Sequence, residues 1–157
     1  MNFWSIAFVV ITLAVLSICA IFDNKNKERV PFWLFFIIPI VYFTVTVCYK
    51  NPINWISVIL GISLSIPFFA LAFMGKCGGA DAIMTACVGA AYGGLYTAVW
   101  LFVACMIFIV TKIIKSRKTG TAFKQILLDN TQSAFIPSAA IAYAVVSTVF
   151  IIIPYIA

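Results

Sequence analysis

The chain has 157 residues, of which 65% are hydrophobic and only 9% are charged, and its mean hydropathy is +1.18. A soluble domain of this length would have to expose much of that apolar surface to water, so a water-soluble globular protein is excluded. The apolar residues form long runs separated by short charged segments, which is typical of an integral membrane protein. We therefore expect an all-α polytopic membrane protein in which residues 1–157 form a single membrane-embedded domain.

Residue types that are missing or scarce exclude several kinds of chemistry. The chain has no histidine, which excludes histidine-ligated zinc or haem and Ser-His or Cys-His catalytic pairs. The five cysteines form no Cys-x-x-Cys pair, so neither a disulfide framework nor a zinc site is indicated. The net charge of +6 comes from basic residues beside the apolar runs, which indicates contact with membrane lipids and not with nucleic acid. We expect no metal and no organic cofactor.

The apolar runs predict six transmembrane helices. Pro31 and Pro137 lie near the starts of two of them, where a missing N–H does no harm, and Pro67 lies inside the third and is expected to kink it. The fourth run is short and has glycines at both ends, which favours a helix whose ends are covered by protein. The expected spans are residues 2–22, 31–49, 53–74, 81–93, 95–113 and 134–156.

Basic residues in the loops predict the orientation of the chain. Of the ten Lys and Arg residues, all but Lys50 lie in the loops after the first, third and fifth expected spans or, for Lys112, at the end of the fifth span. Such an excess marks the cytoplasmic side of a membrane protein. Both termini are therefore expected to lie on the outer side of the cell membrane, which the chain crosses several times.

Small residues recur along the fourth expected span. Rows of small residues at four-residue intervals let helix backbones approach closely in lipid. This span is therefore expected to pack tightly against a neighbouring helix. The row consists of Ala82, Ala86, Ala90 and Gly94, with Gly89 and Gly93 as a second small pair.

The four acidic residues, Asp23, Glu28, Asp81 and Asp129, all fall on the expected cytoplasmic side. Asp23 ends the first span and Asp81 begins the fourth, so the two carboxylates are expected at one membrane depth, where they can face each other. Such a pair shares protons unequally, and an ionised and a protonated carboxyl together perform aspartic proteolysis. Because Asp81 begins a helix and Asp23 ends one, the helix dipoles favour Asp81 as the ionised partner.

The two aspartates also have plain structural interpretations. Asp81 follows Gly-Gly-Ala and is a suitable helix N-cap, and Asp23 can simply end a helix in the polar interface. Glu28 lies within a basic loop, where it is expected to be solvated, and Asp129 is expected to be a loop residue or an N-cap before the last span. Residue type alone leaves these alternatives open.

Three segments resemble the motifs of type IV prepilin peptidases and archaeal preflagellin peptidases, which are GxGD-type intramembrane aspartic peptidases. The first is ICAIFDNKNKERVPFW, in which Asp23 precedes a basic stretch and Pro31. The second is GKCGGADAIMTACVGAAYG, in which Asp81 occupies the aspartate position of G-x-G-D. The third, AFIPSAAIAYAVV, resembles the closing segment with its Ile-Pro-Phe. The segments occur in the family's order, and with the six spans they cover nearly the whole chain.

Three positions depart from the family pattern. Ala80 stands where glycine usually precedes the second aspartate, a change that archaeal preflagellin peptidases tolerate. Ile83 replaces a common lysine, and Phe32 replaces the asparagine that usually follows the proline. These departures leave both aspartates in place and bear on which substrates are preferred.

The resemblance implies a membrane aspartic endopeptidase with Asp23 and Asp81 as its catalytic pair. Its substrates would be prepilin-like or archaellin (preflagellin) precursors, with a short basic leader, a small residue before the cut and a hydrophobic helix after it. The chain lacks the cysteine-rich insertion of the longer bacterial enzymes, which implies no N-methyltransferase activity. Glu28 and Asp129 would attract the basic leader. Residues expected to support the motifs and the approach to Asp81 are Gly75, Gly78, Gly79, Ala80 and Pro31.

Two other classes of protein fit the same composition. A small transporter or channel subunit could bind cations with Asp23 and Asp81, although transporters more typically place ionisable groups near the middle of the bilayer. The other alternative is an inactive assembly factor on the peptidase fold.

Overall fold

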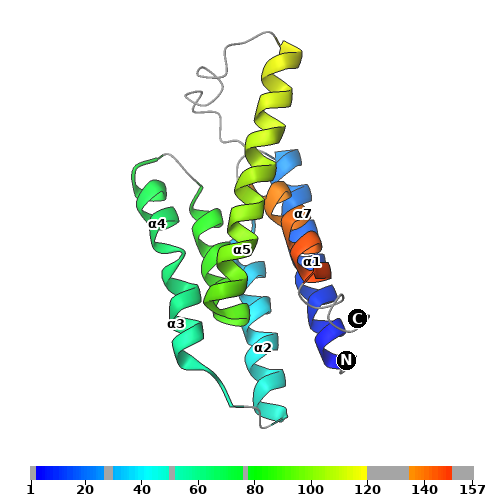
Figure 1. Cartoon of the computed structure of the whole chain (residues 1–157), viewed down its shortest axis with the longest axis vertical. Helices are drawn as coiled ribbons and strands as arrows, with labels where there is room; N and C mark the ends of the chain where they lie inside the picture. The colour runs from blue at the N-terminus through cyan, green and yellow to red at the C-terminus, as the bar shows by residue number, and fades with distance from the viewer. Residues whose placement is uncertain (1–2, 27–29, 50–51, 76–77, 120–134, 150–157) are drawn as a thin grey trace.

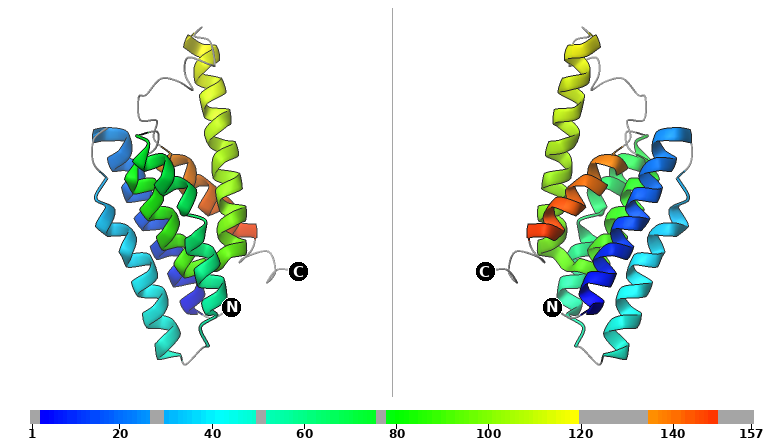
Figure 2. Two further views of the ribbon diagram at one scale, coloured as in Figure 1. Left: turned by 90° about the vertical axis from the view of Figure 1, so that its left-hand side faces the viewer. Right: turned by 90° about the vertical axis from the view of Figure 1, so that its right-hand side faces the viewer.

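The computed structural model describes residues 3–26, 30–49, 52–75, 78–119 and 135–149, and the secondary structure within these ranges is helical, as expected (Figure 1). The helices pack side by side along the long axis of the molecule, as two further views also show (Figure 2). Their bounds are α1 Phe3–Asn26, η1 Phe32–Phe36, α2 Ile37–Cys48, α3 Trp55–Ser63, α4 Ile66–Phe73, α5 Gly79–Thr119 and α7 Ile136–Ser147.

Three apolar helical segments among the described residues are long enough to cross a membrane. They are Ile6–Asp23 in α1, Trp55–Phe73 across α3 and α4, and Gly79–Ile114 in α5. The apolar helices Phe32–Cys48 and Ile136–Ser147 are shorter. Large apolar side chains such as Ile59, Phe73 and Leu95 point outward and are exposed. An apolar exterior of this kind suits a lipid environment and not water.

Prolines determine where two of the expected spans change conformation. Pro39 has no N–H to donate to the carbonyl of Phe35, and the turn before it is the 3₁₀ helix η1 instead of α-helix. The kink expected at Pro67 is present, but the helix breaks slightly earlier, between α3 and α4. There both the N–H and the Oγ of Ser65 donate to the carbonyl of Ile62, at 2.9 and 2.7 Å. A proline disturbs the turn that precedes it, which accounts for this offset.

Helix α5 reverses direction at Gly93, where the backbone has φ 78° and ψ 179°. Residues 79–92, here called the short arm, descend in Figure 1, and residues 94–119, the long arm, rise from the turn. The expected boundary between the spans 81–93 and 95–113 therefore coincides with a break in the helix. At 1.5 Å per residue the short arm is about 21 Å long, less than the hydrocarbon core of a bilayer. Most of the arm is buried in protein.

The short arm packs against α3 through two glycines. A Cβ atom on Gly61 would lie far closer than 3.0 Å to the carbonyl oxygen of Gly89, and a Cβ on Gly89 would meet that of Gly61 in the same way. A Cβ on Gly94 would lie 2.9 Å from the Cβ of Leu60. Backbones that approach this closely require small residues, as in other membrane helix pairs. The expectation that the small-residue row packs tightly against a neighbouring helix is correct.

The turn at Gly93 yields a prediction about stability. Gly93→Ala places a side chain at positive φ and drives its Cβ onto Ser57 Oγ, so we expect a loss of about 2 kcal/mol or more. The measurement is thermal or denaturant unfolding of the purified protein in detergent. The double variant with Ser57→Ala removes the oxygen but not the backbone strain, and it should recover only part of the loss. A Gly93→Ala protein as stable as wild type would contradict the prediction.

Candidate functional site

Asp81 lies in the first turn of the short arm. Helix α5 begins at Gly79, so Asp81 is its third residue, and the N-cap position belongs to Gly78 instead. The Asp81 N–H donates to the Gly78 carbonyl at 3.1 Å, and its Oδ2 lies 3.4 Å from where a Cβ on Gly78 would be. The carboxylate thus folds back to the positive end of its own helix, which favours a negative charge there. Only 8% of the residue is exposed.

Asp23 lies near the end of α1, which continues to Asn26 and so extends past the expected end of the first span. Its side chain is half-buried, and its carboxylate accepts a hydrogen bond from the backbone N–H of Ile136. Ile136 is the first residue of α7, and its N–H is one of those that have no partner within the helix. Asp23 therefore sits at the N-terminus of α7 as well as near the C-terminus of α1.

The segments that carry Asp23 and Asp81 lie at the same end of the bundle. In Figure 1 and both views of Figure 2, the end of α1, the end of α4 and the start of α5 lie at the upper end of the bundle, below the tip of the long arm of α5, and α7 begins on the same side. The end of α2 and the start of α3 lie at the opposite end. The three segments singled out in the sequence thus converge on one end of the molecule, although they are far apart along the chain.

The residues expected to support the motifs have different local roles. Gly75 has φ 69° and donates from its N–H to the Ala72 carbonyl at 3.0 Å, so it ends α4 in the left-handed conformation that glycine adopts easily. Gly79 has open space where a Cβ would be, and Ala80 packs partly buried against the core. Pro31 occupies the N-cap position of η1 with φ −69°. A glycine is therefore required by geometry at Gly75 but not at Gly79.

Two expected site residues, Glu28 and Asp129, lie outside the described residues, as does the basic residue Lys76. Among the described residues, no cluster of three or more His, Cys, Asp or Glu side chains could hold a metal ion. The cysteines that the structure describes, Cys19, Cys48, Cys87 and Cys105, are free thiols.

The structure changes the electrostatic comparison of the two aspartates. The sequence favours Asp81 as the ionised partner because it places Asp23 only at a helix C-terminus. In the folded chain both carboxylates face a helix N-terminus, Asp81 that of α5 and Asp23 that of α7. Helix dipoles alone therefore do not distinguish the ionised carboxyl from the protonated one.

Two residues, one that contacts Asp23 and one that contacts α7, are missing from the expectations drawn from the sequence. Ile136 contributes a backbone N–H, for which a side-chain pattern gives no signal except that Pro137 marks a helix start. Trp100, whose side chain is fully buried, donates from Nε1 to the Ala139 carbonyl of α7 at 2.9 Å. The only sign of it in the sequence is that Trp100 lies four residues after Tyr96, which places both on one side of a helix.

Comparisons of this chain with protein-family models, with curated protein sequences and with solved structures find no match.

Proposed function

We propose that this protein is a membrane aspartic endopeptidase of the prepilin and preflagellin peptidase type, with Asp23 and Asp81 as the catalytic pair. The observation that carries the proposal is that the end of α1, which carries Asp23, and the start of α5, which carries Asp81, lie at one end of the helix bundle (Figure 1), with a helix N-terminus beside each carboxylate. The third family-like segment begins there too, because Ile136 donates to Asp23. A chance resemblance of three short segments would not require all three to lie at the same end of the folded chain.

The proposed chemistry needs the two carboxyls in different protonation states. The ionised carboxylate takes a proton from a water molecule, whose oxygen attacks the carbonyl carbon of the scissile peptide. The protonated carboxyl donates a hydrogen bond to the carbonyl oxygen, which becomes the oxyanion of the tetrahedral intermediate. The carboxyl that took the proton from water then gives it to the leaving nitrogen, and the C–N bond breaks as the oxyanion re-forms a carbonyl. The reaction draws only on the two aspartates and water.

The proposed substrates are prepilin-like or archaellin precursors. Their hydrophobic helix would lie in the bilayer against the apolar exterior of the bundle, and its cytoplasmic end would present the cleavage site to the aspartates. The basic leader would extend into the cytoplasm, where Glu28 and Asp129 would attract it. N-methylation of the product is not part of the proposed activity.

The proposed topology has six crossings of the cell membrane, with both termini outside and the catalytic pair on the cytoplasmic side. One support is the break at Gly93, because the short and long arms of α5 can then be two separate crossings. The other is the position of the basic residues. Lys112 and Arg117 lie in the last turns of the long arm, toward the end of the bundle where α1 ends. This is the distribution that the positive-inside rule favours on the cytoplasmic side.

The function can be tested by mixing the purified protein in detergent or liposomes with a precursor that carries a short basic leader and an apolar helix. We expect loss of the leader, detected by mass spectrometry at a single bond after a small residue. A bulky residue in place of that small one should block the cut. Intact precursors together with ion flux that depends on Asp81 would support the transporter alternative instead. Intact precursors without flux would leave the inactive assembly factor.

A further inference from the structure

A row of side chains on the long arm of α5 faces α7. Residues at four-residue intervals lie on one side of a helix. In this row Tyr96 Oη hydrogen-bonds Ser147 Oγ at 2.7 Å, Trp100 Nε1 donates to the Ala139 carbonyl at 2.9 Å, and the Phe108 ring meets the Phe135 ring edge-on at 5.7 Å. Ala104, the member between them, is fully buried. The row therefore follows α7 from its last turn to the residue before its start.

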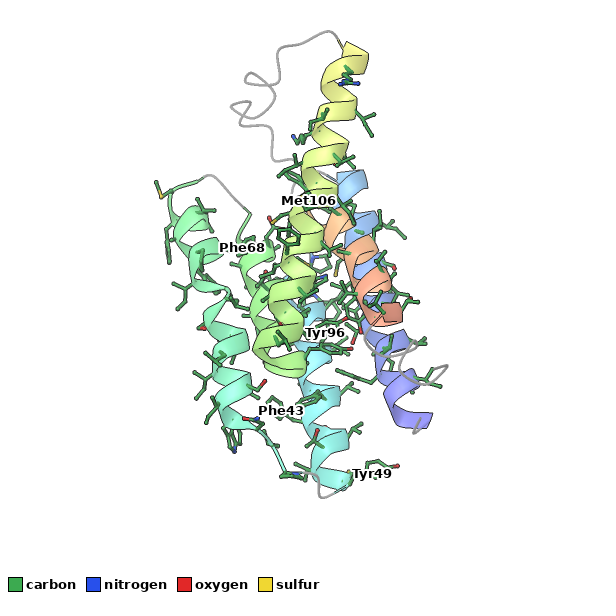
Figure 3. All side chains as sticks on the ribbon, viewed as in Figure 1. Phe43, Tyr49, Phe68, Tyr96 and Met106 are labelled. Carbon is green, nitrogen blue, oxygen red and sulfur yellow. The ribbon has the colours of Figure 1, made fainter. Side chains whose placement is uncertain are left out.

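The contacts of this row fix α7 against α5 at both ends. Tyr92 adds a hydrogen bond to the Tyr143 hydroxyl from the other side of the Gly93 turn. Tyr96, labelled in Figure 3, lies near the middle of the bundle, whereas Met106, farther along the same arm, lies toward the end where α1 ends. In lipid, where apolar burial gives helices little reason to associate, side-chain hydrogen bonds between helices help to fix their relative position.

The Trp100 contact lies one helical turn from the residue that touches Asp23. Ala139 accepts from Trp100, and Ile136, which donates to Asp23, is three residues earlier in α7. The Ala139 N–H also donates to the Phe135 carbonyl at 3.0 Å, which closes this first turn. The turn is therefore a short rigid link between the indole of Trp100 and the carboxylate of Asp23.

We propose that Trp100 is a positioning residue, which holds the first turn of α7 through the Ala139 carbonyl so that the Ile136 N–H orients the carboxylate of Asp23. The proposal rests on the proposed function, because orientation of Asp23 matters to catalysis only if Asp23 is catalytic. The same helix, α5, carries Asp81 on its short arm. Trp100 lies on the long arm of α5, beyond the turn at Gly93, and contacts the helix α7 that holds Asp23.

The indole N–H can be removed without leaving an unpaired buried group. A carbonyl oxygen has two lone pairs, and inside an α-helix one of them accepts from the N–H four residues later. Trp100→Phe therefore removes the tie to α7 while the Ala139 carbonyl keeps its helical hydrogen bond. Tyr96→Phe is the matched control, since it removes a hydrogen bond to the far end of the same helix.

The first measurement is cleavage of the precursor by wild type and both variants. We expect Trp100→Phe to lower kcat about tenfold with KM within twofold, because the substrate still binds but the carboxylate is misoriented. Tyr96→Phe should keep kcat within twofold of wild type. Equal losses in the two variants would indicate a general packing effect and overturn the proposal.

The second measurement does not depend on activity. Dicyclohexylcarbodiimide reacts with a protonated carboxyl in an apolar setting, where the acid O–H adds across a C=N bond and the adduct rearranges to a stable N-acylurea. A carboxylate held by the Ile136 N–H should react slowly. We expect the Asp23 peptide to be labelled several times faster in Trp100→Phe than in wild type or Tyr96→Phe, with Asp81 labelling unchanged, as followed by mass spectrometry.

The two measurements separate the two ideas. Faster Asp23 labelling in a protein that cuts no precursor would support the positioning role and refute the peptidase. Unchanged labelling would overturn the positioning role even if cleavage occurs. Should Trp100→Phe not be recovered as monodisperse protein, benzothienylalanine at position 100 keeps the fused rings, lacks the N–H and permits the same comparison.

Discussion

Asp23→Asn and Asp81→Asn are each expected to lower the rate of precursor cleavage about a thousandfold or more. The reaction needs one carboxylate to remove a proton from water and one carboxyl to donate a hydrogen bond, and an amide does neither in the required way. Because the two groups act together, the double variant should be no slower than either single one. The measurement is the initial rate of leader removal by purified protein at a fixed precursor concentration.

The control for this experiment is that each variant remains folded in the membrane. Asn is close in size to Asp and can still accept through its Oδ1 from the N–H of Ile136 or at the start of α5, so expression and unfolding temperature should be near those of wild type. Normal expression with full cleavage by either variant would refute the catalytic pair. A loss of cleavage in only one of them would assign the chemistry to a single carboxylate and require a different mechanism.

Gly61→Val and Gly89→Val are expected to destabilise the protein strongly, with each losing about 3 kcal/mol or more and much of the membrane-inserted yield. A side chain at either position collides with the backbone of the other glycine, which cannot move as the end of a flexible side chain can. Both changes should also remove cleavage activity, because the short arm that carries Asp81 packs on α3 at this contact. Yield of monodisperse protein and unfolding in detergent measure the effect.

Gly79→Ala is the matched control for the glycine variants. Gly79 begins α5 two residues before Asp81, and a Cβ there has open space around it. We expect this variant to express and unfold as wild type does, so that a general sensitivity of glycines can be distinguished from the contact with α3. Gly61→Val or Gly89→Val proteins with wild-type stability would show that the two backbones are farther apart than described.

Part of the candidate site is visible in the sequence because its residues are rare in this chain. A carboxylate is conspicuous in a chain that is 65% hydrophobic, and the loop charges predict that Asp23 and Asp81 lie on one side of the membrane. The partner of each carboxylate is not visible in the same way. Asp23 is next to the Ile136 N–H because α7 packs beside α1, and a backbone group leaves no mark in a pattern of side chains.

The helices, too, have features that the sequence predicts and others that only the folded structure shows. Proline and glycine act through the local backbone, so the kink near Pro67 and the break at Gly93 could be predicted within a few residues. The partner of the small-residue row could not, because every apolar span is a suitable neighbour by composition. Only packing shows that Gly61 of α3 faces Gly89. From the sequence, Tyr96 and Trp100 could equally well face lipid. Only the structure shows that they contact α7.

By itself, the sequence determined that this is a helical protein suited to a membrane, where its helices bend or break, and which few residues can carry charge chemistry. These properties depend on composition, hydropathy and local backbone geometry, which act over one or two helical turns. The tertiary structure decided which helices touch, and so which N–H faces Asp23 and which glycine Gly89 meets. These contacts depend on shape complementarity between segments far apart in the chain, which no local pattern encodes.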